Sequence, residues 1–80
     1  MYSYRPEILD ELARHGLVPR PDTHPPQLRD AVRELYKYEI RRLKGRLLAR
    51  EFQKADYAGR VIDLRRRYII LSIPLDHWTV

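Results

Sequence analysis

Six cationic side chains in two short runs are the residues of this sequence best suited to bind an anion. They are Arg41, Arg42, Lys44, Arg65, Arg66 and Arg67. A guanidinium group offers several N–H donors in a planar fork, which suits the oxygens of phosphates and carboxylates. We therefore predict that these residues contact an acidic partner or nucleic acid, with phosphate contacts and little readout of base identity.

One carboxylate, Glu39, falls on the apolar side of the helix expected around it. At about 100° per residue it projects close to the direction of Val32 and Leu35. A carboxylate at the edge of a core needs a cation, and Arg42 or an arginine of a neighbouring helix can supply one. We predict a structural ion pair between Glu39 and Arg42 rather than a catalytic acid.

Five aromatic residues have two roles open to them. Their rings either pack between helices, with the tyrosine hydroxyls reaching water, or anchor an interface with a partner. Tyrosine interleaved with arginine also suits base stacking. These candidate core or interface anchors are Tyr36, Tyr38, Tyr57, Tyr68 and Trp78.

The sequence carries no pattern typical of catalysis or metal binding. His15, His24 and His77 are far apart and belong to no HExxH or comparable ligand spacing. There is no GxSxG, GxGxxG or Walker loop, and no cysteine for a thiolate zinc site. A substrate pocket also needs a concavity that an 80-residue monomer can hardly supply. We expect no catalytic activity, no metal, no cofactor and no small-molecule substrate.

Local signals predict a short first helix at about residues 6–15. Pro6 fits a first helical position, and apolar residues follow at three- and four-residue spacings. Gly16 has the position of the residue just after a helix end, so Leu17 can contact Leu12 in a Schellman ending.

Two longer helices are expected after a proline-rich, extended connection at residues 18–26. Apolar residues recur every three or four positions over about 26–51 and again over about 54–71. The break between them contains neither proline nor glycine, so a single helix over 26–71 is the alternative, and it would bury its stripe only by pairing with another chain. We predict an antiparallel hairpin with the first helix packed across it, which closes a core within one chain.

The chain beyond the third helix is apolar and is expected to form an extended strap over residues 72–80. Pro74 ends the helix, and Ile73, Leu75 and Trp78 are predicted to fold back over a core that is otherwise too small. The predicted fold class is therefore all-α, a single three-helix domain with a short first helix, a long helical hairpin and a C-terminal strap.

The net charge of +5 is concentrated in one part of the chain. Residues 41–67 hold ten basic residues against three acidic ones, a net charge of +7, which attracts anionic partners. Arg65, Arg66 and Arg67 spread over about 200° of the third helix, so they cannot all contact one linear ligand. A helix-turn-helix is not predicted, because the second helix is about twice too long for one.

These features favour a small basic protein-interaction or self-assembly module, with a protein partner or a second copy of the chain bound to it. A chain of this size buries only about 60–65% of its unfolded surface, so a partner would add stability. The alternative is a non-sequence-specific nucleic-acid-binding protein that uses residues 41–67. The longest apolar run is too short to span a membrane, no signal peptide is visible, and the lack of cysteine fits a cytoplasmic location.

Overall fold

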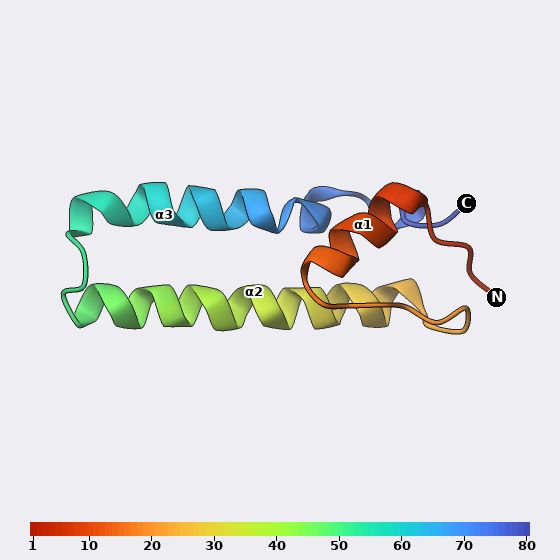
Figure 1. The fold of residues 1–80 in the computed structure, drawn as a ribbon, viewed down its shortest axis with the longest axis horizontal. Helices are drawn as coiled ribbons and strands as arrows, with labels where there is room; N and C mark the ends of the chain where they lie inside the picture. Colours follow the sequence, from red (N-terminus) through yellow and green to blue (C-terminus); the bar gives the residue numbers. More distant parts are fainter.

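A computed structural model describes all residues 1–80 and contains three α-helices (Figure 1). Helix α1 spans Pro6–Arg14, α2 spans Pro25–Leu48 and α3 spans Lys54–Arg67. Two short 3-10 helices follow α3, η1 at Ile69–Ser72 and η2 at Leu75–His77. The predicted all-α, three-helix fold is confirmed.

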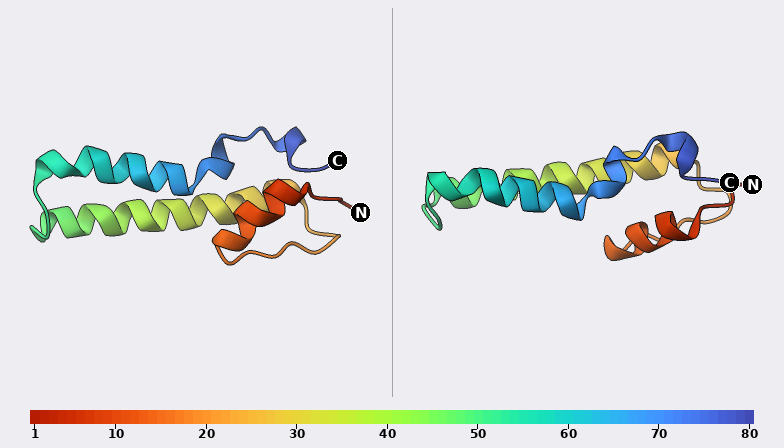
Figure 2. Two further views of the ribbon diagram at one scale, coloured as in Figure 1. Left: turned by 45° about the horizontal axis from the view of Figure 1, so that its top comes forward. Right: turned by 90° about the horizontal axis from the view of Figure 1, so that it is seen from above.

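Helices α2 and α3 form an antiparallel hairpin, so the molecule is a rod of 47 × 16 × 16 Å. Helix α1 lies on one side of this hairpin, near the end of the rod that also holds both termini (Figures 1 and 2). The other end, with the turn between α2 and α3, is covered by no third element. A single helix over residues 26–71 is therefore excluded.

The end of α1 has the predicted glycine motif. Gly16 adopts a φ of +74°. The Leu17 N–H donates to the Leu12 carbonyl at 2.9 Å, and the Gly16 N–H donates to the Ala13 carbonyl at 3.0 Å. This pair of hydrogen bonds defines a Schellman ending and satisfies carbonyl groups that the helix leaves without partners.

The end of α2 has the same motif without a glycine. Arg50 adopts a φ of +59°. The Glu51 N–H donates to the Arg46 carbonyl and the Arg50 N–H donates to the Leu47 carbonyl, each at 3.0 Å. The side chains of Arg46 and Glu51 also form an ion pair at 3.3 Å. Because the left-handed residue redirects the chain, α2 ends at Leu48 rather than continuing to residue 51.

Replacing Arg50 with glycine is expected to stabilise the fold. A left-handed conformation costs an L-residue about 1–2 kcal/mol and costs glycine nothing, while the greater freedom of glycine in the unfolded chain offsets part of this gain. We expect a rise in melting temperature of about 3–6 °C by circular dichroism, corresponding to roughly 0.5–1 kcal/mol. The control is Ala49→Gly, at a φ of −79°, which should not raise the melting temperature. A lower melting temperature for Arg50→Gly would contradict the prediction.

The core lies at the end of the rod where α1 packs on the hairpin. One cluster of nine buried side chains forms it: Tyr4, Ile8, Leu12, Leu28, Val32, Leu64, Tyr68, Ile70 and Trp78. None of them comes from residues 33–63, where Leu43 alone is buried. We call residues 41–62, which make up the distal part of the hairpin, the arm. It is a pair of helices with almost no core of its own.

The apolar side chains of α2 and α3 occupy more of the helix surface than the fold buries. The side chain of Leu35 on α2 is 37% exposed, and that of Ile62 on α3 is 48% exposed. The reason is that α1 and the C-terminal residues supply a third layer only at one end of the hairpin. The apolar stripes therefore continue onto surface that is open to a partner.

The C-terminal residues fold back over the core, with more helical turn than a fully extended strap. Tyr68 leaves α-helical geometry at φ −106° and ψ 35°, so α3 ends before residue 71 and η1 continues the chain. Trp78 is fully buried, and its Nε1–H donates to the Ile73 carbonyl at 3.1 Å. Thr79 pairs with Tyr4 in an isolated antiparallel bridge, which ties the two ends of the chain together.

Candidate functional site

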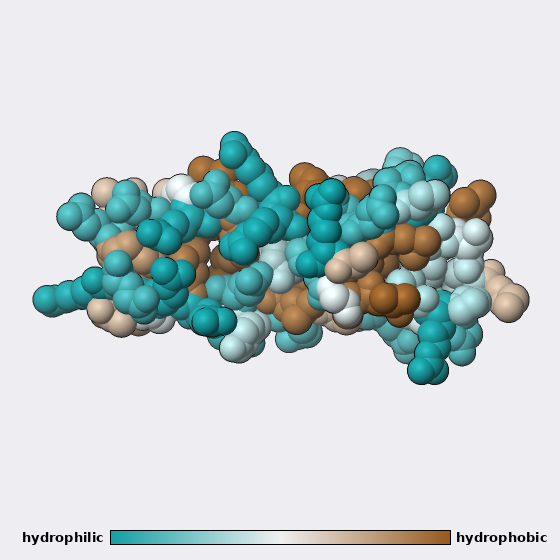
Figure 3. Space-filling model, viewed as in Figure 1, coloured by the Kyte–Doolittle hydropathy of each residue, from teal (hydrophilic) through white to brown (hydrophobic).

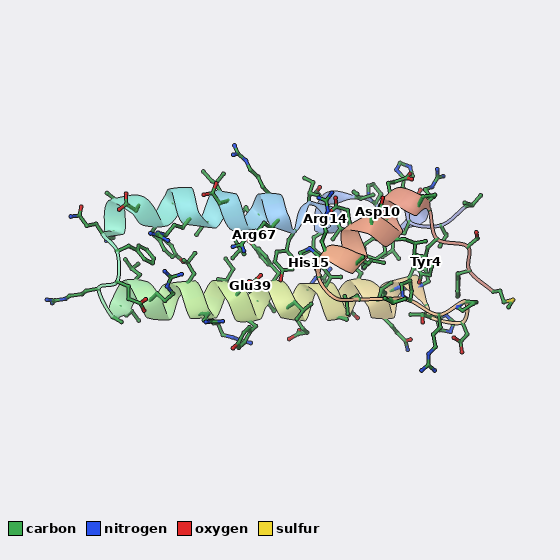
Figure 4. The ribbon with its side chains drawn as sticks, viewed as in Figure 1. Tyr4, Asp10, Arg14, His15, Glu39 and Arg67 are labelled. Atoms are coloured by element: carbon green, nitrogen blue, oxygen red, sulfur yellow. The ribbon has the colours of Figure 1, made fainter.

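Two adjoining clefts open between α2 and α3, with volumes of about 670 and 660 Å³. They share Glu39, Arg42 and Arg67, so we treat them as one feature and call it the arginine groove. Figure 4 shows Glu39 on α2 and Arg67 on α3 facing each other across the space between the helices, with His15, the residue after α1, beside them. The first cleft lies along the arm, where the hairpin has no third layer, and the second lies where α1 meets the hairpin.

The arginine groove combines positive charge with apolar and aromatic side chains, of which Leu35 and Tyr38 are exposed. Six arginines line it: Arg14, Arg42, Arg46, Arg60, Arg66 and Arg67. The acidic residues are Glu39, Glu51 and Asp63, and the apolar and aromatic ones are Leu35, Tyr38, Leu43, Leu64 and Tyr68. On this face of the molecule, hydrophilic side chains lie over and between apolar patches (Figure 3). This composition suits an anionic ligand that also has an apolar side.

Two of the six arginines are neutralised by a nearby carboxylate. Arg14 pairs with Glu11 at 3.2 Å, and Arg46 pairs with Glu51 at 3.3 Å. The arginines that take part in no ion pair within 4.0 Å are Arg42, Arg60, Arg66 and Arg67. The groove therefore retains guanidinium groups that are available to an external anion.

The predicted ion pair between Glu39 and Arg42 does not form. Neither residue belongs to any of the four ion pairs of the structure. Glu39 is half-buried, and its carboxylate acts on the hydroxyl group of Tyr68, whereas Arg42 is exposed. Helical spacing brings the two charged residues to the same groove, but it does not bring them within ion-pair distance.

Three aromatic rings pack together where α1 meets the hairpin. The rings of His15 and Tyr68 are stacked at 4.1 Å with an interplanar angle of 19°. The ring of Tyr36 meets Tyr68 edge-on at 5.3 Å. Burial of the Tyr68 hydroxyl raises its pKa, and hydrogen bonding to Glu39 and the negative charge of that carboxylate raise the pKa further.

The raised pKa of Tyr68 predicts a loss of stability in alkali. Above about pH 10 the unfolded chain releases this proton before the folded protein does, so the folded state then holds more protons. The stabilising contribution is complete below that pH and is lost as the pH rises further. We expect the urea midpoint to fall less steeply above pH 10 for Tyr68→Phe than for the unmodified protein. Tyr38→Phe is the exposed control, and equal slopes for all three proteins would refute the prediction.

The six predicted anion-binding residues are divided between the groove and other surfaces. Those that line the groove are Arg42, Arg66 and Arg67. Those that line neither cleft are Arg41, Lys44 and Arg65. The division follows from helix geometry, because consecutive residues differ by about 100° around the axis.

Other groove residues were not among the sequence-based candidates. Arg14 and His15 reach the groove only because α1 crosses the hairpin, which no local spacing indicates. Arg46 lies two helical turns beyond Glu39, so the helical period predicts that the two residues lie on the same face of α2. Arg60 stacks over the ring of Phe52 at 4.2 Å and reaches the groove from α3.

The five aromatic candidates divide between the core and the surface. Tyr68 and Trp78 are buried in the core cluster. Tyr36 and Tyr57 are half-buried. Tyr38 is 56% exposed and lines the groove, so it offers the most accessible ring of the five to a ligand or partner.

Neither a metal centre nor a membrane-spanning helix is present. No group of three or more His, Cys, Asp or Glu side chains is placed to hold a metal ion. None of the helices combines the length and the apolar character needed to cross a membrane.

Comparisons with protein-family models, curated proteins and solved structures find no match to this chain.

Proposed function

We propose that this protein is an interaction module, without catalytic activity, that binds an acidic amphipathic helix of a partner protein along the arm. The observation that carries the proposal is an arginine-lined groove on a hairpin of only two helices. A third helix laid in the groove would complete a small bundle, as in other helix-in-groove complexes. We place this role in the cytoplasm, because a chain without cysteine fits a reducing compartment.

The part of the groove along the arm has the size and composition for a short helix. From Glu39 to the end of α2 at Leu48 the helix rises about 14 Å, which is the length of two to three turns. Leu43 and Leu64 lie at the bottom of this cleft but are only 9% and 2% exposed, so they offer a ligand little apolar surface. Acidic residues of the ligand would meet the surrounding guanidinium groups, and these contacts would contribute most of the binding.

Charge argues against a second copy of the chain as the occupant. Residues 41–67 carry a net charge of +7, so two arms brought together would repel each other. Helix α1 is acidic, but its apolar residues Ile8 and Leu12 are 1% and 0% exposed in its own core. Its other leucine, Leu9, is 40% exposed, and a single exposed leucine gives the helix little apolar surface to offer to the groove of another copy.

Nucleic acid is the second candidate, and fewer features support it. Half of the six predicted phosphate-contacting residues lie outside the groove, so no single phosphate backbone would contact the whole set. The basic charge of residues 41–67 supports both candidates, whereas the spread of the basic residues over several surfaces argues against a single nucleic-acid backbone as the ligand.

The proposal is tested with a designed peptide of about 15 residues, long enough for a few helical turns, with leucine on one face and glutamate elsewhere. Fluorescence anisotropy should show saturable binding at low salt. Arg42→Glu should weaken that binding by about tenfold or more, because it places a like charge against the ligand in the groove. Arg41→Glu is the matched control, with the same charge change on the neighbouring residue outside the groove.

Light scattering and ultraviolet absorbance of the purified protein separate the other occupants. We expect a monomer that is free of nucleic acid. A dimer that persists at high salt would replace the proposal with self-assembly, and co-purifying nucleic acid that high salt removes would favour the second candidate. Equal weakening of peptide binding by Arg41→Glu and Arg42→Glu would show a general charge effect and would overturn the groove as the binding site.

A further inference from the structure

We infer that the end of the arginine groove next to α1 is a second binding site, which takes a small phosphate ester with a planar or apolar body. The site is the cleft of about 660 Å³ lined by residues of all three helices. Its volume lies within the range of about 300–1,000 Å³ that is typical of small-molecule pockets. This ligand is separate from the partner helix proposed for the arm.

The site is assembled from residues that are distant in sequence. The last turn of α1 supplies Arg14, and His15 follows it as the helix cap. The last turn of α3 supplies Arg66 and Arg67, and Arg42 comes from the second half of α2. Figure 4 shows Arg14 and Arg67 at this end of the hairpin. Tertiary packing thus brings four guanidinium groups to the rim of one cleft.

The charge that remains in the cleft suits a ligand with one or two negative charges. Arg14 is paired with Glu11, and the single carboxylate in the cleft, Glu39, offsets one further arginine. The carboxyl ends of α1 and α3 both lie beside the cleft, and each contributes about half a negative charge. After these contributions, the three unpaired arginines leave roughly one net positive charge in the cleft, which neutralises part of the charge of a phosphate monoester and is unsuited to a polyanion.

The apolar wall of the cleft indicates what the phosphate carries. The side chain of Tyr38 is 56% exposed and that of Leu35 is 37% exposed, and both line this cleft. An inorganic anion would leave these surfaces in water. A planar ring would cover them, because an aromatic face packs favourably against a tyrosine ring and an aliphatic side chain.

Phenyl phosphate is the probe for this site, with inorganic phosphate as the comparison ligand. Two-dimensional NMR of the ¹⁵N-labelled protein should show saturable shifts at Tyr38 and Arg66 with phenyl phosphate. We expect phenyl phosphate to bind about tenfold more tightly than inorganic phosphate. Arg66→Ala should weaken binding by about tenfold, because it removes a charged hydrogen-bond donor.

The control is Arg65→Ala, which removes the same charge from the adjacent residue of α3, outside both clefts. Both arginines are exposed, so circular dichroism should show the same fold for both variants. Equal weakening by the two variants, or the absence of saturable shifts, would overturn the site. Equal affinities for phenyl phosphate and inorganic phosphate would overturn the assignment of the apolar wall. Arg66 lines only this cleft, whereas Arg42 and Arg67 also line the cleft along the arm, so peptide binding should survive Arg66→Ala. The effect of this variant on the two ligands therefore distinguishes failure of one proposal from failure of the other.

Discussion

Trp78→Ala is expected to lower the free energy of unfolding by about 3–5 kcal/mol, the usual result of truncating a large buried aromatic residue. Trp78 is 0% exposed and is the largest fully buried side chain of the protein. Its indole N–H donates to Ile73, and its carbonyl accepts a hydrogen bond from the Arg5 N–H at 3.0 Å. A domain of this size has a total stability of roughly 4–12 kcal/mol, so the variant should be close to unfolding.

Urea unfolding followed by circular dichroism measures this effect. Val80→Ala is the matched control, because Val80 lies in the same segment but is 89% exposed and should change stability by less than about 0.5 kcal/mol. Removal of residues 73–80 should act in the same direction as Trp78→Ala. An unchanged urea midpoint for Trp78→Ala would show that the segment is dispensable to the fold and would point to a role for it in partner binding.

Leu12→Ala is expected to lower the free energy of unfolding by about 2–5 kcal/mol, because it leaves a cavity where α1 meets the hairpin. Leu12 is 0% exposed, and its carbonyl accepts the Leu17 N–H of the Schellman ending. Helix α1 is only nine residues long, too short to be stable by itself, so it depends on this contact.

The comparison with Leu9→Ala separates the effect of burial on stability from the effect of the leucine-to-alanine change itself. Leu9 belongs to the same helix and undergoes the same chemical change, but it is 40% exposed. Leu9→Ala should therefore lower the free energy of unfolding by less than about 1 kcal/mol. Similar urea midpoints for the two variants would show that α1 is not part of the cooperative core. The position of α1 also matters for function, because its last turn places Arg14 at the proposed phosphate site.

Local chemistry in the sequence determined the all-α fold and much of its layout. The helical spacing of apolar residues predicted the hairpin, and Gly16 predicted the ending of α1, because each depends on residues within a few positions of one another. The turn at Arg50 had no such signal, since a residue other than glycine seldom adopts a left-handed conformation.

Tertiary structure alone decided which charged residues share a site. The sequence identified Arg42, Arg66 and Arg67 as cationic candidates, and helix geometry separates them from Arg41 and Arg65, but only the packing of the three helices brings them together with Arg14 at one cleft. The partner of Glu39 was likewise a tertiary outcome, because it depends on where α3 places the Tyr68 hydroxyl. Helical spacing defines the direction in which a side chain leaves its own helix, whereas the groups that it meets depend on how the helices pack.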